Sequence, residues 1–326
     1  MIPTNKIHCL TLPVPYAMEN VNVYLVEGDV LTLVDTGTNS PETFEALKSS
    51  LKGLGYQIKD VEQVILTHHH PDHAGLLEVF NDDVMIVGHE RNIPYLTQEE
   101  TFLNLYSKFF IDMAIKCGVP DKFIQKMPQK IKQVPFSSKR GLTHVIGEGD
   151  TLESFPGFEI LYTPGHATSH IILYRESDGL AFGGDLLLDK VSSNPIIEPP
   201  LNGDISRPKP LIQYNQSLQR IAKLPIKTLL TGHGAPVTDV KGLVDVRLQK
   251  QKARAEKVLD LLKQNSLTAY EVCQFIFPKV YEKQLSLTLS ETIGQLDYLE
   301  DLNFIRLDER NDGILEYKAN EHSVSN

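Results

Sequence analysis

The 326-residue chain has only three cysteines, an odd number scattered at Cys9, Cys117 and Cys273. None belongs to a Cys-x-x-Cys pair, so they are expected to be buried or free thiols in a reducing compartment. The N-terminus lacks a basic region followed by a long apolar run, so no signal peptide is predicted. No apolar stretch approaches the ~20 residues that cross a membrane. We therefore expect a cytoplasmic protein without a membrane anchor.

Basic residues are also scarce relative to acidic ones. Lys and Arg number 32 against 42 Asp and Glu, which gives a net charge of −10. This excess argues against a general binder of polyanions. The length exceeds what one typical core needs, and it suggests two domains.

The sequence is organised around a dense group of metal-competent side chains. A short apolar run that predicts a buried strand, Val64–Leu66, leads into the histidine loop, Thr67-His68-His69-His70-Pro71-Asp72-His73-Ala74-Gly75. His68 and His70 alternate by two, so they point the same way in an extended backbone. Asp72 and His73 follow the proline that fixes the turn. The spacing therefore favours one metal ion bound by His68 and His70 and a neighbouring ion bound by Asp72 and His73. The alternative is a histidine-rich surface loop that binds metal only by accident.

Three further metal-competent residues follow predicted strands at 158–162, 180–182 and 228–230. The strands end in Thr163-Pro164-Gly165-His166, Gly183-Gly184-Asp185 and Thr231-Gly232-His233-Gly234. Ligands bind outside the carboxyl ends of strands in layered α/β folds, and the glycines allow sharp turns and close approach. The candidate ligands are therefore His68, His70, Asp72, His73, His166, Asp185 and His233.

The remaining patterns up to residue 240 predict a layered α/β domain. Hairpin strands at 21–26 and 30–34 lead to Asp35, which either forms a turn or supports the histidine loop through hydrogen bonds. Ser40 and Pro41 begin a helix that ends near Gly55. A short helix is expected at 75–80, and strands at 84–87, 144–146 and 171–174. A helical insertion is expected at about 92–130, and its apolar stripe either packs in the core or forms a lid: Phe102, Leu105, Tyr106, Phe109 and Met113.

These motifs resemble those of the metallo-β-lactamase superfamily in kind and order. The match comprises HxHxDH in the histidine loop, TPGH, GGD and GHG, while Asp35-Thr36-Gly37 looks like the first motif of that family. The resemblance implies an αββα sandwich, in which two sheets lie face to face between outer helices, with metals at one edge.

Carried over residue by residue, the resemblance implies two divalent metal ions. The first would be held by His68, His70 and His166, and the second by Asp72, His73 and His233. Asp185 would bridge them, and Asp72 would also orient the nucleophile. Asp35 would support the histidine loop, whereas His170 would either support the site or simply pack. Zinc is the default ion, although Mn²⁺ or Fe²⁺ suits such mixed ligands too.

Two positions separate the chain from parts of that family. Asp185 stands where lactam-cleaving members typically place a cysteine or lack the bridging aspartate, and His70 stands where flavodiiron proteins use glutamate. The layout looks more like glyoxalase II, lactonases and RNA-processing nucleases. We expect a hydrolase of a small ester or thioester, without the glutathione specificity of glyoxalase II. The alternatives are an endoribonuclease or phosphodiesterase and a metal-binding regulatory protein that does no chemistry.

The composition changes near residue 241, and a second domain is expected at 241–320, with a tail at 321–326. A long amphipathic helix, a helix capped by Thr268, a helix at 284–302 and hairpin strands at 304–307 and 314–317 follow the order of a winged helix. The arrangement resembles the C-terminal domain of β-lactamase-like endoribonucleases.

The charge of this second domain argues against DNA as a partner. Residues 241–326 hold 12 basic and 14 acidic side chains. The third helix is expected to turn an apolar stripe inward, namely Leu289, Ile293, Leu296 and Leu299. Its other face is expected to carry Glu291, Asp297, Glu300 and Asp301. Because phosphate contacts dominate nucleic-acid affinity, we expect no DNA binding by this helix. RNA is kept as an alternative substrate, and a homo-oligomer is left open.

Overall fold

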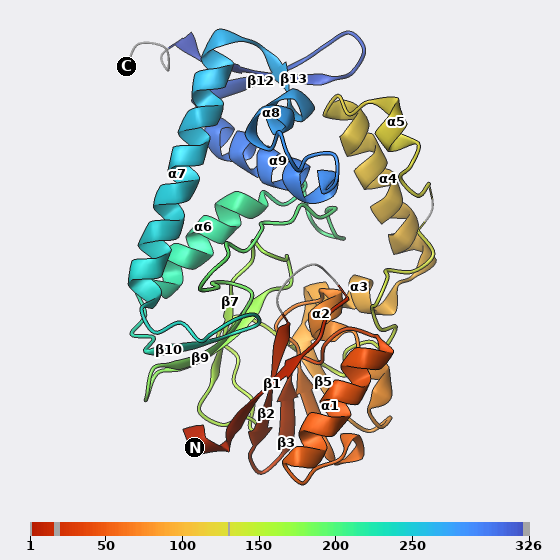
Figure 1. The fold of residues 1–326 in the computed structure, drawn as a ribbon, viewed down its shortest axis with the longest axis vertical. Coiled ribbons are helices and arrows are strands. Elements are labelled where there is room, and N and C mark those ends of the chain that lie inside the picture. Colours follow the sequence, from red (N-terminus) through yellow and green to blue (C-terminus); the bar gives the residue numbers. More distant parts are fainter. Residues whose placement is uncertain (1, 16–19, 130, 322–326) are drawn as a thin grey trace. The chain divides into compact units, whose positions relative to one another are not determined.

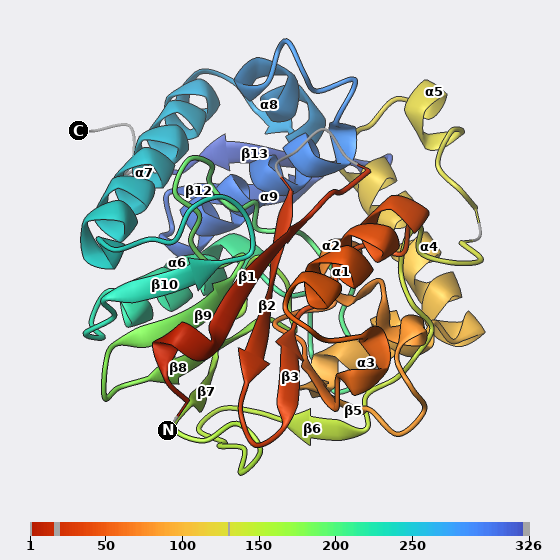
Figure 2. The ribbon, with the colours of Figure 1, turned by 60° about the horizontal axis from the view of Figure 1, so that its bottom comes forward.

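The computed structural model describes residues 2–15, 20–129 and 131–321. The chain forms two compact units, each assembled from separate stretches of sequence (Figures 1 and 2). The first unit comprises Met1–Glu99, Gln133–Ser193 and Ser217–Val244. The second comprises Glu100–Lys132, Asn194–Gln216 and Asp245–Asn326.

The larger sheet of the first unit has six strands in chain order. They are β1 (Ile7–Leu12), β2 (Val21–Glu27), β3 (Leu31–Val34), β4 (Gln63–Ile65), β5 (Met85–His89) and β6 (His144–Ile146). The pairs β1–β2 and β2–β3 are antiparallel, and the pairs from β3 to β6 are parallel. Therefore β3 and β4 deliver Asp35 and the histidine loop to the same edge of this sheet.

The smaller sheet has the order β10-β9-β8-β7. Its strands are β7 (Glu159–Tyr162), β8 (Ile171–Arg175), β9 (Leu180–Gly184) and β10 (Thr228–Thr231). The pair β9–β10 is parallel and the other two pairs are antiparallel. Hence β7, β9 and β10 run in the same direction, and the residues that follow each of them gather at one edge.

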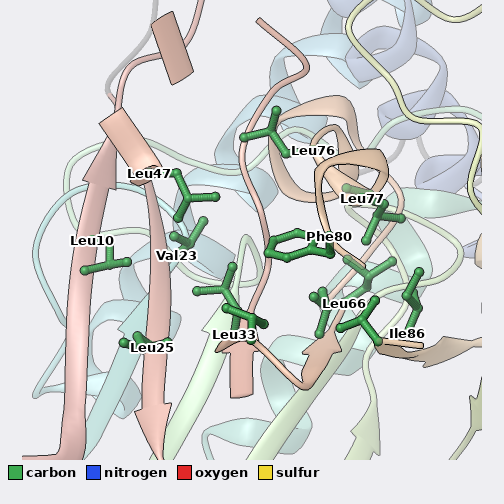
Figure 3. Packing of buried hydrophobic residues seen from close by; sticks show 14 of the residues in the cluster. Leu10, Val23, Leu25, Leu33, Leu47, Leu66, Leu76, Leu77, Phe80 and Ile86 are labelled. Carbon is green, nitrogen blue, oxygen red and sulfur yellow. The ribbon is translucent and has the colours of Figure 1, made fainter. Parts of the chain in front are cut away.

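Side-chain alternation buries both faces of the larger sheet. On β2, Val23 and Leu25 enter a cluster covered by helix α1 (Pro41–Gly53), whereas Tyr24 and Val26 enter a cluster shared with β9. Figure 3 shows the first cluster, in which Leu47 of α1 lies near Val23. The second cluster joins the inner faces of the two sheets.

The outer face of the smaller sheet is covered by the last turns of α6 (Pro210–Ile221). Ser217 donates to the carbonyl oxygen of Pro164 at 2.8 Å, and Arg220 donates to that of Tyr162 at 3.2 Å. Two sheets face to face with helices outside constitute the αββα sandwich, so the predicted fold class of this unit is confirmed.

Local signals account for the first helix. The Thr43 N–H donates to Ser40 Oγ at 3.2 Å, Pro41 occupies the first position, and Gly55 has a positive φ of 90° beyond the end. The predicted caps are therefore confirmed. Shorter elements are η1 (Thr4–Lys6), η2 (Ile58–Asp60), η4 (Glu90–Asn92) and α3 (Ile93–Thr97).

Two features of the first unit differ from the prediction. Strand β1 was not predicted, although Leu10 and Leu12 are buried and alternate with exposed residues. The short helix expected at 75–80 is present only as a three-residue 3-10 helix, η3 (Leu77–Val79). A four-residue α-helix that was not expected, α2 (Pro71–Ala74), precedes it inside the histidine loop. The reason is that a proline favours the first position of a helix, so the helix begins at Pro71.

The second unit is mainly helical. Its elements are α4 (Glu100–Lys116), α5 (Asp121–Ile124), most of α7 (Val240–Gln264), α8 (Ala269–Ile276), α9 (Leu285–Asp301), β11 (Leu267–Thr268), β12 (Ile305–Glu309) and β13 (Leu315–Ala319). The strands form a small antiparallel sheet in the order β11-β13-β12. One apolar cluster joins α4, α7, α8 and α9. The predicted Thr268 cap is confirmed, since the Glu271 N–H donates to Thr268 Oγ1 at 3.2 Å.

Two side chains of this unit lie differently from the prediction. Leu105 of α4 is 43% exposed, so it is not part of the core stripe, whereas Phe109 and Met113 pack against the apolar cluster. Asp297 was expected on the exposed acidic face of α9, but it is 3% exposed and pairs with both terminal nitrogens of Arg207 at 2.7 and 2.5 Å. Arg207 belongs to Asn194–Gln216, far away in sequence, so the pattern of the helix alone did not reveal it.

Candidate metal centre

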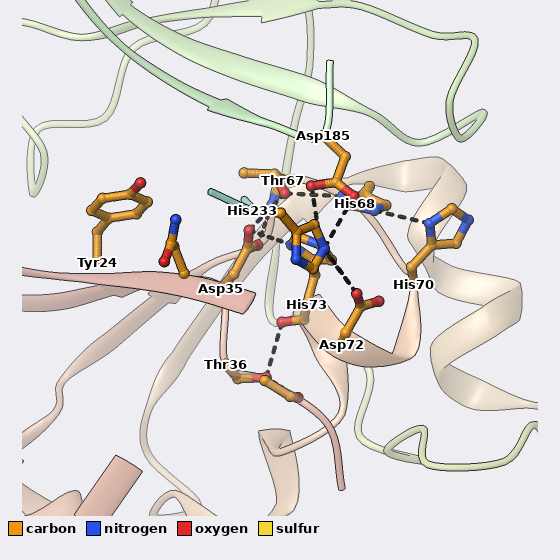
Figure 4. Close-up of polar contacts among 12 residues, drawn as sticks. Tyr24, Asp35, Thr36, Thr67, His68, His70, Asp72, His73, Asp185 and His233 are labelled. Carbon is orange, nitrogen blue, oxygen red and sulfur yellow. Dashed lines mark hydrogen bonds and ion pairs between the residues drawn. The ribbon is translucent and has the colours of Figure 1, made fainter. Parts of the chain in front are cut away.

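The histidine loop leaves the end of β4 and is held by Asp35, which leaves the end of β3. The Asp35 carboxylate accepts hydrogen bonds from the N–H of Thr67 at 2.8 Å and from its hydroxyl at 2.7 Å. It also faces His73 Nδ1 at 2.8 Å (Figure 4). The φ of Asp35 is 62°, a left-handed conformation that aspartate adopts more readily than most residues. Asp35 therefore positions the loop and the ring of His73.

The neighbouring residue Thr36 fixes the backbone of helix α2. Its N–H and its hydroxyl both donate to the carbonyl oxygen of His73, at 2.7 and 2.9 Å. Thr67 continues the support on the other side, with its Oγ1 3.0 Å from His68 Nδ1. Because the Thr67 hydroxyl donates to Asp35, it can accept from His68 Nδ1, which leaves Nε2 of His68 for a ligand. No role was predicted for Thr67, and only its place at the strand end could have suggested one.

The loop after β10 is held by side chains of β2. Tyr24 donates to the carbonyl oxygen of Thr231 at 2.7 Å, and Asn22 donates to Thr231 and Gly234 at 3.1 and 2.8 Å. His233 Nδ1 lies 2.9 Å from the carbonyl oxygen of Asn20 and donates to it, so Nε2 is left for a metal. These partners are more than 200 positions apart, and no sequence pattern indicated them.

Asp185 is positioned through His170. The Asp185 N–H donates to His170 Nε2 at 3.2 Å, and His170 Nδ1 shares a hydrogen bond with Thr163 Oγ1 at 2.9 Å. Burial, together with the nearby His166 charge, lowers the pKa of His170 to about 3, so it is a neutral acceptor at neutral pH. Gly184 has a φ of 47°, and a Cβ there would lie 2.8 Å from His170 Nε2. The sequence left the role of His170 open, and the structure places it against the backbone of Asp185.

The seven candidate ligands converge in the first unit. Ligand atoms within 4.8 Å of one another form three groups: His68, His70 and His166; His68, His73 and Asp185; Asp72, His73 and His233. Asp185 Oδ1 lies 3.5 Å from His73 Nε2, while its Oδ2 lies 3.5 Å from Nε2 of both His166 and His233. Asp72 Oδ2 lies 3.2 Å from His233 Nε2. One carboxylate thus faces two groups of histidines, with Asp72 beside the second.

The chemistry of these atoms fits divalent cations. His73 Nε2 and Asp185 Oδ1 are buried, and neither has a hydrogen-bond partner among the residues that the structure describes. Buried polar atoms are rarely left in that state. Imidazole nitrogen and carboxylate oxygen are the ligands that zinc and related ions take in proteins. A pair of cations in contact with these groups would satisfy them.

Electrostatics divides the histidines into two classes. Burial, reinforced by neighbouring histidines, lowers the pKa of His68 and His70 well below the usual value. Burial also opposes protonation of His73 and His233, but the charge of Asp185 outweighs it. The pKa of His73 is raised well above its usual value, and that of His233 is raised to about 10. Without a metal, protons on these two rings balance the carboxylates, so cations would have to displace them.

Two other histidines make stacking contacts. His69 stacks on Tyr95 with ring centroids 3.5 Å apart, and its Nδ1 lies 2.8 Å from Ser169 Oγ. His89, to which the sequence assigned no role, stacks on Tyr162 at 4.4 Å.

Comparison with known proteins agrees with this geometry. Residues 17–233 match the model of the metallo-beta-lactamase superfamily. The chain is 44% identical over 299 residues to the probable metallo-hydrolase YqjP of Bacillus subtilis (strain 168), covering 91% of this chain and 93% of that protein. It is similar to the structure of a metallo-beta-lactamase family protein from Thermus thermophilus, with a TM-score of 0.79, 28% identity and 97% and 99% of the two chains covered.

A beta-lactamase domain protein from Burkholderia ambifaria shares the fold, with a TM-score of 0.75, 20% identity and 97% and 94% of the two chains covered. The matched residues contain the histidine loop and the three later ligand positions, His166, Asp185 and His233. The chain belongs to the metallo-beta-lactamase superfamily, and it carries the buried histidine and aspartate clusters of a metallo-hydrolase.

Proposed function

We propose that the protein uses two divalent cations, zinc by default, to hydrolyse a small ester or thioester. The observation that carries this proposal is the position of Asp185. Its two oxygens lie 3.5 Å from His73 on one side and 3.5 Å from His166 on the other. A carboxylate shared between two ligand groups supports a pair of cations ~3.5–4 Å apart. Asp185 Oδ2 also lies 3.5 Å from His233 Nε2, so His233 would complete the ligands of the second cation.

When bound, the two cations would activate a water molecule for attack and polarise the carbonyl oxygen of the substrate. The residues of the chain would hold that arrangement. His68, His70 and His166 would hold one cation, and Asp72, His73 and His233 the other. Asp72 has only 10% of its side chain exposed, and it would orient the attacking water with the oxygen not used for binding. Asp35 and Thr67 would keep two of the imidazoles in place, so no protein nucleophile is needed.

Thioesters are favoured over lactams as the substrate class. A relative from Aspergillus fumigatus named atrochrysone carboxyl ACP thioesterase is 25% identical over 250 residues, covering 76% of this chain and 46% of that protein. Asp185 also occupies the place of the cysteine typical of lactam-cleaving members. Both points support the glyoxalase II-like branch, without glutathione specificity.

The C-terminal part of the second unit supports a winged helix. Its elements follow the order α7, β11, α8, α9, β12, β13, and the strands form one antiparallel sheet. Strand β11, which the sequence did not predict, supplies the third strand. The third helix of this domain, α9, is contacted by residues of the segment Asn194–Gln216. Asp297 pairs with Arg207, and a Cβ on Gly294 would lie 3.0 Å from Leu211. We propose that this domain does not read DNA with α9.

RNA cleavage is the second candidate. The winged-helix-like order favours it, because β-lactamase-like endoribonucleases have such a domain. The net charge of −10 disfavours a polyanionic substrate.

A reducing compartment such as the cytoplasm is proposed for the protein. All three cysteines are free, and Cys117 and Cys273 are buried. Burial raises the pKa of the Cys117 thiol to about 12, so this thiol is unreactive at neutral pH.

The test is a turnover panel of acyl thioesters, acyl esters and single-stranded RNA, measured with metal-loaded and chelator-treated protein. We expect thioester or ester hydrolysis that chelation abolishes and added Zn²⁺ restores. RNA cleavage without acyl hydrolysis would replace the proposal with the second candidate. Two bound metals with no turnover of any substrate would indicate a regulatory metal-binding protein.

A further inference from the structure

The second unit contains a cavity of about 610 Å³ that the proposed hydrolysis does not use. That volume lies within the ~300–1,000 Å³ typical of small-molecule pockets. Its walls come from α4, from Val119, from α5 and the segment that follows it, from residues 196 and 197, and from residues within 282–290, where α9 begins. Figure 1 shows α4 and α5 in yellow and α9 in blue.

The interior of the cavity is suited to an apolar ligand body. Phe110, Met113 and Met127 are among its lining residues, and methionine adapts to irregular apolar shapes. Two buried serines of the lining already have backbone partners. Ser107 Oγ accepts from the Ile131 N–H at 2.8 Å. Ser290 donates to the Pro195 carbonyl oxygen at 3.0 Å and accepts from the Ile197 N–H at 2.8 Å. Ser290 therefore both donates and accepts within the chain and does not need a polar partner from a ligand.

The charged residues that line the cavity are two lysines and one glutamate. Lys126 and Lys283 line the cavity and are exposed, and neither forms an ion pair within the described part of the chain. The third charged lining residue, Glu282, faces Lys122 at 4.0 Å and accepts a hydrogen bond from Tyr281 at 3.2 Å. Glu282 thus has partners of its own, whereas the two lysines have no ion-pair partner among the described residues and are available to an anion.

We propose that this cavity binds a fatty acid anion, with the hydrocarbon chain inside and the carboxylate beside Lys126 and Lys283. An apolar chamber and a cationic rim together match an amphipathic anion better than either a neutral hydrocarbon or a small polar anion. The assignment goes beyond the proposed hydrolysis, because it gives the second unit a ligand of its own and requires no reaction there.

The experiment is calorimetric titration of the full chain with octanoate, decanoate and dodecanoate below their aggregation concentrations. Chelator-treated protein is used, so that hydrolysis does not contribute. We expect one site per chain, with affinity rising about fourfold per methylene, the fold-change that corresponds to ~0.8 kcal/mol per buried CH₂. The variant Asp185→Asn should bind dodecanoate as the wild type does, whatever the outcome of the turnover panel.

Charge reversal tests the rim. The double variant Lys126→Glu with Lys283→Glu should bind dodecanoate at least about tenfold more weakly. The reason is that hydrogen bonds between charged groups contribute more binding free energy than neutral ones. The matched control, Lys257→Glu with Lys279→Glu, changes the net charge equally at exposed lysines that do not line the cavity. It should bind within about twofold of the wild type, because distant exposed charges are screened. Neutral 1-dodecanol should bind the wild type and the rim variant equally.

Filling the chamber tests the interior. Ser286 is an exposed lining residue, so Ser286→Trp should fold and yet weaken dodecanoate and 1-dodecanol alike. Melting curves of every variant without ligand identify any that fail to fold. The proposal is overturned if wild-type protein binds no dodecanoate. It is also overturned if both charge-reversed variants bind dodecanoate equally, or if Ser286→Trp leaves its affinity unchanged.

Discussion

At the scale of single residues, the aspartates of the centre have different tasks. Asp185 faces ligand atoms on two sides, at 3.5 Å in each direction. The Asp35 oxygens instead contact Thr67 and His73, at 2.7 and 2.8 Å, so Asp35 would act on a bound metal only through the ring of His73. Such a difference in contacts implies different consequences of mutation.

We predict that Asp185→Asn lowers kcat/KM and the affinity for the second metal equivalent more than Asp35→Asn does. Groups that only orient ligands typically change affinity or activity ~10–100-fold, and that range is expected for Asp35→Asn. Asparagine tolerates the left-handed backbone of Asp35, so the fold is preserved. Metal titration measures the affinity for the second metal equivalent, kinetics measure kcat/KM, and melting curves measure whether the fold is preserved. Equal loss of melting temperature and turnover by Asp185→Asn, with metal content unchanged, would mean that Asp185 is structural.

The raised pKa values predict how pH acts on the metal-free protein. The pKa of His233 is raised to about 10, above the ~6.5 of an unfolded chain, so its protonated form stabilises the folded state. That contribution is complete below about pH 6.5 and is lost as pH rises toward 10. Cations need the neutral ring, so the increase in melting temperature upon Zn²⁺ addition should grow from pH 6.5 to 9. Calorimetry in two buffers should show proton release at pH 7, whereas a pH-independent increase without proton release would contradict this view.

At the scale of elements, the site depends on where strands end. Strands β7, β9 and β10 run in one direction, and their ends deliver His166, Asp185 and His233 to one edge. The backbone there is tightly packed. A Cβ on Gly232 would lie 2.2 Å from Asp185 Oδ1 and 2.7 Å from His73 Cε1.

We predict that Gly232→Ala displaces Asp185 or His73 and lowers metal affinity by ~10-fold or more, as disturbed ligand orientation does. Gly53→Ala is the matched control, because a Cβ at Gly53 meets nothing within 4 Å. It should leave metal binding unchanged and raise stability by up to ~1 kcal/mol, since alanine favours a helix. Competition titrations with a chromophoric chelator measure the metal affinity of both variants. Equal affinities would show that Gly232 does not constrain the site.

Much of this arrangement was predictable because its signals are local. Strand ends marked by glycine and a ligand indicated the site, and caps at Ser40 and Thr268 indicated helix starts. What was missed depends on distant partners. Tyr24 donates a hydrogen bond to the loop at Thr231, and Arg207 forms an ion pair with Asp297. Neither contact produces a periodic pattern in the sequence. Strand β11 was missed as well, because it is two residues long and exists through pairing with β13.

At the scale of the whole molecule, the net negative charge disfavours a polyanionic partner such as DNA. The net charge is −10, and no helix among the described residues is long and apolar enough to cross a membrane. The full chain should therefore show no measurable affinity for random-sequence duplex DNA at low salt, because no counterions would be released by α9. Fluorescence anisotropy is the measurement. Micromolar affinity that weakens steeply with salt would reopen a nucleic-acid role.

The central claim is that seven side chains of the first unit hold two metal ions around Asp185. Anomalous X-ray diffraction from Zn²⁺-loaded crystals tests it most directly. Two peaks are predicted, each ~2.0–2.2 Å from its ligand atoms. The first should contact His68, His70 and His166, the second should contact Asp72, His73 and His233, and both should contact Asp185. A single peak, or two peaks that Asp185 does not join, would contradict the account.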